Sequence, residues 1–121
     1  MSRDRIVTGR EAEDQAVAYL LGKGWTLVAR NWRCRHGEID IIMRDGEVWV
    51  FIEVRSRHHS QRYGAAKEAI DARKQLRVRS TVEWYIMKHQ LYDEKLRCDA
   101  IAITFLPDGQ APRIEHFHAA F

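Results

Sequence analysis

The sequence predicts one mixed α/β domain in which helices pack against a single β-sheet. Its length of 121 residues is that of one domain with one hydrophobic core. Segments with helical and strand patterns follow one another in the order helix, three strands, helix, two strands. Glycine and proline number only seven and two, and no linker is evident. We therefore expect a single domain over residues 1–121, with residues 1–7 as a flexible N-terminus.

Capping signals and apolar spacing predict the two helices. Thr8 and Glu11 form a capping-box pattern that opens the first helix. Gly22 and Gly24 are expected to end it. The second helix is expected from Ala65 to about His89. The apolar stripe of the first helix consists of Ala12, Ala16, Tyr19 and Leu20.

Runs rich in β-branched and aromatic residues predict five strands. Between the second and third runs, Asp45-Gly46 is a strong hairpin signal. The polar stretch 56–64 is expected to be a loop. The five runs are residues 25–33, 37–43, 47–55, 98–105 and 111–118.

The composition is that of an ordinary soluble protein, with 45% hydrophobic and 31% charged residues. No apolar run is long enough to span a bilayer, and the first residues lack the apolar segment of a signal peptide. Cys34 and Cys98 lie far apart in the sequence, which argues against a disulfide scaffold. We expect a cytoplasmic protein with no membrane partner. The net charge of +3 permits a nucleic-acid partner without requiring one.

The predicted hairpin gathers carboxylates on one sheet face. If Asp45 and Gly46 are the two loop residues, Glu38 faces Glu53, and Asp40 is a diagonal neighbour of Glu53. Such carboxylates repel one another unless a cation lies between them. A polar sheet face that is simply solvated is the common alternative. The polar face would carry Glu38, Asp40, Phe51, Glu53 and Arg55, and the apolar face Ile39, Ile41, Val50, Ile52 and Val54.

Two cations are candidates for this position. Arg55 is one, and a divalent metal is the other. Oxygen-only ligands suit hard cations, so the metal would be Mg²⁺ or Mn²⁺.

At this point the sequence resembles a known family. The segments GEID at 37–40 and FIEVRSR at 51–57 resemble motifs of the YraN-type family of uncharacterised proteins. That family is similar to the archaeal Holliday-junction resolvases of the PD-(D/E)XK restriction-endonuclease-like superfamily. The resemblance covers roughly residues 8–121. Further matches are Gly9-x-x-x-Glu13-x-x-Ala16, Asn31, Tyr63-Gly64, Lys74-Gln75, Arg97-x-Asp99 and Ala120-Phe121.

The resemblance implies a restriction-endonuclease-like fold with a mixed sheet of about five strands, and a nuclease site on it. Its catalytic residues would be Glu13, Asp40, Glu53 and Arg55, with Asp40 and Glu53 as ligands of Mg²⁺ or Mn²⁺. Glu13 has a plainer interpretation, because acids are common in the first turn of a helix. Ile39 replaces the proline of the superfamily motif, which is a mild change.

Arg55 stands where the superfamily usually has lysine. An arginine can clamp a phosphate but is a poor general base, because it does not lose its proton. Two functions therefore remain open. One is an endonuclease that hydrolyses phosphodiester bonds, with branched or structured DNA as its substrate. The other is a non-catalytic nucleic-acid-binding or adaptor module that retains the nuclease fold.

Basic residues around the motifs predict contacts with nucleic acid. The two-fold symmetry of a DNA junction fits a homodimer. His116 and His118 lack the four well-spaced ligands of a zinc site, so the sequence does not favour zinc there. The predicted nucleic-acid contacts are Arg35, Arg57, Arg62 and Lys74, and the residues expected to support the site are Glu38, Tyr63 and Gln75.

Overall fold

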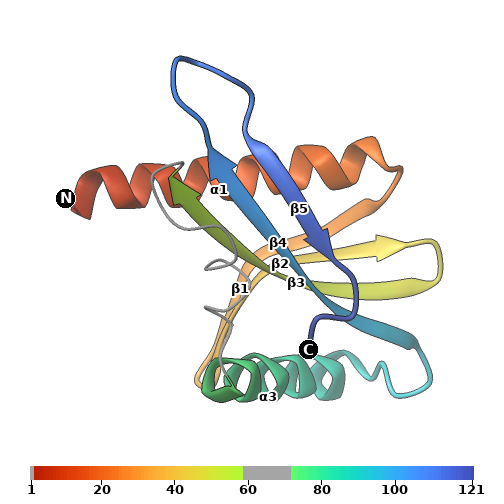
Figure 1. Ribbon diagram of the computed structural model, residues 1–121. Helices are drawn as coiled ribbons and strands as arrows, with labels where there is room; N and C mark the ends of the chain where they lie inside the picture. Colours follow the sequence, from red (N-terminus) through yellow and green to blue (C-terminus); the bar gives the residue numbers. More distant parts are fainter. Residues whose placement is uncertain (1, 59–71) are drawn as a thin grey trace.

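A five-stranded sheet lies between two helices in the computed structural model, which describes residues 2–58 and 72–121 (Figure 1). The strands lie in the order β1-β2-β3-β4-β5. The predicted mixed sheet and the predicted order of elements are confirmed. The elements are α1 (Ser2–Gly22), β1 (Thr26–Cys34), β2 (Gly37–Asp45), β3 (Val48–His58), α3 (Ala72–His89), β4 (Lys95–Phe105) and β5 (Arg113–Phe117).

Among the described strands only β3 and β4 pair in parallel, and the other neighbouring strands are antiparallel. Parallel neighbours need a crossover connection, and α3 lies in the connection between β3 and β4. Because side chains alternate between the two faces, the central strands can pack against a helix on each side.

Each helix covers its own hydrophobic cluster. On one face α1 contributes Ala12, Ala16 and Leu20, which pack with sheet residues such as Ile41 and Ile101. On the other face α3 packs Val78, Val82 and Tyr85 against sheet residues that include Ile42 and Phe51. The sheet is therefore buried on both faces at its centre. Neither described helix has the length and apolar character needed to cross a lipid bilayer.

Several predicted boundaries are wrong, and β4, expected from residue 98, begins at Lys95. The helix α1 begins at Ser2 rather than at Thr8, so residues 2–7, expected as a flexible N-terminus, lie within the helix. Nothing between Ser2 and Thr8 breaks a helix, since this stretch has neither glycine nor proline. The strand β3 continues to His58 because residues 56–58, expected in a loop, pair with β4. The remaining predicted loop and the predicted helical residues 65–71 lie outside the described residues.

The predicted register of the β2–β3 hairpin is also wrong. Asp45 pairs with Val48, so Gly46 and Glu47 form the turn. Gly46 has φ 61°, a left-handed conformation that glycine adopts without strain. The observed register differs from the predicted one by an even number of residues. Side chains alternate with a period of two, and the register shift therefore moves no strand to the opposite face.

The apolar face was predicted correctly except at Ile39. This side chain packs with Ile42 and Phe51 in the α3 cluster rather than with Ile41. An irregularity in β1 accompanies the change, because Asn31 has φ 52° at the point where β1 passes this part of β2. The face carrying the carboxylates is partly covered by α3 and is not a solvated surface.

Gly37 lets the tip of the β1–β2 hairpin approach α3. It has φ 149°, and a Cβ atom at this position would lie 2.8 Å from Thr81 Oγ1. Thr81 is fully buried, and its hydroxyl donates a hydrogen bond to the Arg77 carbonyl at 2.9 Å. The hydroxyl therefore has little room to move.

Gly37→Ala is predicted to lower the free energy of unfolding by about 1–3 kcal/mol, because it introduces both backbone strain and a steric clash. Urea denaturation measures this loss. In a Thr81→Ala background the same change should cost less, because the clash is removed. Gly9→Ala is the control, since Gly9 is helical with open space around it and alanine should stabilise the protein there. An equal loss in both backgrounds would contradict the proposed contact.

Candidate functional site

The strands β2 and β3 separate at the candidate site. Their pairing runs from Asp45↔Val48 to Ile41↔Ile52 and ends there. Beyond this point β2 stays with β1 and β3 stays with β4, and Figure 1 shows β3 turning away from β1 and β2. The side chain of the next β2 residue, Asp40, enters the gap between the strands.

Asp40 and Glu53 meet in this gap from opposite strands. Continuing the observed register by one step places them directly across from each other, rather than diagonally as predicted. Asp40 Oδ2 accepts a hydrogen bond from the Val54 N–H at 2.8 Å, in place of a strand carbonyl. The two carboxyl groups also hydrogen-bond to each other. The divergence of the strands therefore creates a fixed pair of carboxyl groups.

This pair retains a proton near neutral pH. Burial, together with the charges of Glu53 and Glu13, raises the pKa of Asp40 to about 8, although the Val54 hydrogen bond opposes the rise. Burial also raises the pKa of Glu53, against the effect of Arg55. A hydrogen bond between two carboxyl groups needs one proton, and a divalent cation can take the place of that proton. The donor set consists of oxygen atoms, which fits Mg²⁺ or Mn²⁺.

Two cationic side chains lie beside Glu53, which is only 6% exposed. Arg55 Nη2 is 2.9 Å from Glu53 Oε1, and Lys74 Nζ is 3.6 Å from the same oxygen. Arg55 Nε is buried and has no hydrogen-bond partner among the residues that the structure describes. The site therefore combines acidic oxygens with positive charge, as a centre for a phosphate ester requires.

A cleft of about 410 Å³ opens over the carboxyl pair, between the tip of the β1–β2 hairpin and α3. Of the predicted site residues, Glu38, Asp40, Glu53, Arg35 and Lys74 line it. The other lining residues are Cys34, His36, Gly37, Arg77, Val78 and Thr81.

Some predicted residues lie at the edge of the site. Glu13 is close enough to raise the pKa of Asp40, but it does not line the cleft. Arg30 Nη2 lies 3.6 Å from Glu13 Oε1. Glu38 was predicted to face Glu53. It instead pairs with Arg33, whose Nε lies 3.3 Å from Glu38 Oε2.

Other predicted residues lie away from the cleft. Gln75 lines a neighbouring cavity. Arg57 was predicted to contact nucleic acid, but it is only 4% exposed and is therefore not a surface group in this arrangement. Side chains alternate along β3, so the Arg57 side chain lies on the same face of the sheet as Arg55, the face that α3 partly covers. Arg62 and Tyr63 lie outside the described residues.

The structure also brings together a cluster that was not foreseen from the sequence. Asp99, His116 and His118 offer ligand atoms that all lie within 4.8 Å of one another, a grouping that could hold a metal ion. Asp99 lies on β4, and the histidines lie on and just after β5, so only the β4–β5 pairing unites them. Aspartate with two histidines is a ligand set typical of transition metals rather than of Mg²⁺.

The Asp99 carboxylate already makes four hydrogen bonds. Arg97 donates two, at 2.9 and 3.1 Å, and the Ala119 N–H donates one at 2.9 Å. His116 Nε2 lies 2.8 Å from Asp99 Oδ2. Burial alone would raise the pKa of Asp99, but these hydrogen bonds outweigh burial and hold its pKa below the usual value. The cluster thus anchors the C-terminal segment to β4, and a metal there would have to displace Arg97.

The raised pKa of Asp40 predicts a pH-dependent stability in the absence of metal. The folded state binds a proton that the unfolded state releases above pH 3.8, so stability should fall as the pH rises from about 4 to about 8. Asp40→Asn should flatten this slope because asparagine does not titrate. Thermal unfolding in EDTA at several pH values measures the effect.

Asp108→Asn is the matched control, because Asp108 is an exposed turn residue whose change also removes one carboxylate. It should leave the slope unchanged. Identical slopes for wild type and Asp40→Asn would contradict the shared proton.

Comparison with known proteins places the chain in a family. Residues 12–103 match the family described as "Uncharacterised protein family UPF0102". A UPF0102 protein of Pelotomaculum thermopropionicum is 40% identical over the full length of both chains. One from Anaeromyxobacter dehalogenans is 43% identical, over 97% of this chain and 85% of its own. One from Pseudomonas paraeruginosa is 40% identical, over 99% of this chain and 94% of its own. The matched segment includes the carboxyl pair and both adjacent cations, and the chain belongs to the UPF0102 family.

Proposed function

We propose that this chain is a cytoplasmic nucleic-acid-binding protein that acts as a metal-dependent endonuclease, with Asp40 and Glu53 as ligands of Mg²⁺ or Mn²⁺. The observation that carries the proposal is the buried, hydrogen-bonded carboxyl pair where β2 and β3 separate. The resemblance of the surrounding motifs to PD-(D/E)XK nucleases supports the same assignment. When bound, the ion would polarise the scissile phosphate and lower the pKa of a water molecule.

The residues around the pair have distinct tasks in this proposal. The Val54 N–H fixes the orientation of Asp40, so that the free oxygens of the pair stay together. Arg55 remains charged and can clamp a phosphate oxygen. Lys74 is an amine on the same side of Glu53 and, unlike a guanidinium, can lose its proton. Lys74 is therefore the candidate proton acceptor that Arg55 cannot be.

The substrate we propose is DNA with a branched or otherwise structured region. Arg35 and Arg77 lie on the cleft walls, where they can contact the phosphates on either side of the cutting position. Such contacts position a strand without reading its bases.

A non-catalytic nucleic-acid-binding or adaptor module is the second candidate. The close ion pair between Arg55 and Glu53 favours it, because the arginine already neutralises a carboxylate that a metal would use. In that case the cleft would bind a phosphate without hydrolysing the ester.

DNA cutting distinguishes the two candidates. The protein is incubated with branched, single-stranded and linear DNA, in Mn²⁺ or in EDTA. We expect cutting only with Mn²⁺. The rate of cutting should fall by a factor of about 100 or more in Asp40→Asn and in Glu53→Gln, because each variant removes a charged ligand. Gel analysis of labelled products measures the rates.

Glu47→Gln provides the control, because Glu47 is an exposed acid in the hairpin turn. This variant should cut DNA at the rate of the wild type. Cutting in EDTA, or undiminished cutting by either site variant, would contradict the proposal. Binding of DNA by the wild type without any cutting would support the second candidate.

A further inference from the structure

A second cavity lies beside the carboxyl pair. Its volume is about 530 Å³, which is within the range of roughly 300–1,000 Å³ typical of sites for small ligands. It is bordered by three strands, the first turn of α3 and the C-terminal residues. The proposed hydrolysis does not use it. Its wall includes Arg55, Gln75, Ala100, Ala102, His116, Phe117 and His118.

The register of the sheet explains why there is a cavity here. Glu53, Ala100 and Phe117 form one row across β3, β4 and β5. Arg55 and Ala102 belong to the next row. An alanine in the middle of each row leaves space above β4. With strands roughly 4.8 Å apart, Phe117 lies about 10 Å from Glu53 along the sheet.

Arg55 connects this cavity to the metal centre. Its guanidinium is 2.9 Å from Glu53 and also lines the cavity, while its Nε has no hydrogen-bond partner in the described part of the chain. Lys74 and Gln75 are consecutive residues of α3. Lys74 lines the cleft, and Gln75 lines the cavity. A nucleic-acid strand with a phosphate at Glu53 would therefore place the adjoining nucleotide at the cavity.

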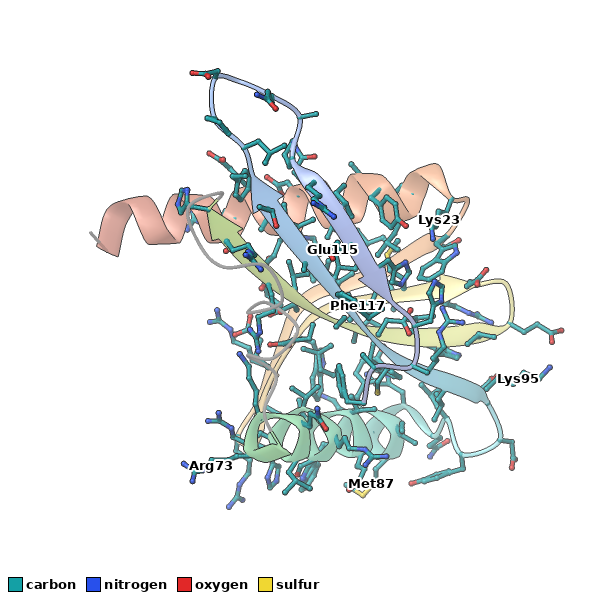
Figure 2. The ribbon with its side chains drawn as sticks, viewed as in Figure 1. Lys23, Arg73, Met87, Lys95, Glu115 and Phe117 are labelled. Atoms are coloured by element: carbon teal, nitrogen blue, oxygen red, sulfur yellow. The ribbon has the colours of Figure 1, made fainter. Side chains whose placement is uncertain are left out.

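The lining suits a base, which has an apolar face and a polar edge. Alanines lie beside Phe117, whose ring is of the kind on which bases stack, and Gln75, His116 and His118 offer polar groups to the edge of a base. Glu115, which pairs with Ala102, is the neighbouring β5 residue on the same face of the sheet as Phe117. Figure 2 shows Glu115 and Phe117 along the same strand, β5.

We propose that this cavity binds one unpaired nucleotide, next to the phosphodiester held at Asp40 and Glu53. The inference rests on the proposed function for that neighbouring phosphodiester. A base inside a duplex is paired and stacked, so only an unpaired or extruded base can enter this cavity. The substrate class is thus narrowed to nucleic acid with an unpaired nucleotide at the cutting position.

The test compares binding to two labelled DNA duplexes of the same sequence, of which one carries a single bulged nucleotide. Fluorescence anisotropy in EDTA measures binding without cutting. The wild type should bind the bulged duplex about tenfold more tightly, since base stacking on an aromatic ring is worth that much. Ala102→Leu, which fills the cavity, and Phe117→Ala, which removes the ring, should each abolish the preference and bind the paired duplex normally.

The control is Ala18→Leu, which makes the same change on the exposed face of α1 and should keep the preference. A wild type without preference, or a preference that survives both cavity variants, would overturn the proposal. A preference lost only in the cavity variants, without any cutting in Mn²⁺, would support the cavity and contradict the nuclease.

Discussion

Two carboxyl groups can share a hydrogen bond only when one of them keeps a proton, and Asp40 and Glu53 do so where β2 and β3 separate. The sheet creates this arrangement, because β2 follows β1 and β3 follows β4 beyond the last pair of the hairpin. Burial on both faces then makes a second negative charge unfavourable. The protonation of the pair therefore follows from the topology of the sheet.

The neighbouring structure keeps this pair in place. Arg55 and Lys74 offset the charge of Glu53 from β3 and from α3. The tight contact of Gly37 with Thr81 holds the hairpin tip against α3 and so forms the wall of the cleft. At the far edge of the sheet, the hydrogen bonds of Asp99 fix the C-terminal segment that borders the second cavity. A single sheet face thus carries the carboxyl pair and the neighbouring cavity.

Local patterns were sufficient to predict the order of elements and the shared face of Asp40 and Glu53. The hairpin register was predicted wrongly because Gly46 suits either of two overlapping turns, and sequence alone does not choose between them. The prediction that Asp40 and Glu53 share a sheet face remained correct, because the two registers differ by an even number of residues. The Asp99 cluster was missed because its members meet only through the pairing of β4 with β5. The burial of Arg57 likewise depends on long-range packing, which no short motif reveals.

The central claim is that a divalent ion replaces the proton shared by Asp40 and Glu53. Calorimetric titration with Mn²⁺ at pH 7, in two buffers of different ionisation enthalpy, tests it most directly. We predict about one proton released for each ion bound by the wild type and by His118→Ala, and no binding by Asp40→Asn. Binding without proton release, or binding lost in His118→Ala and kept in Asp40→Asn, would contradict the account and place the ion at the Asp99 cluster.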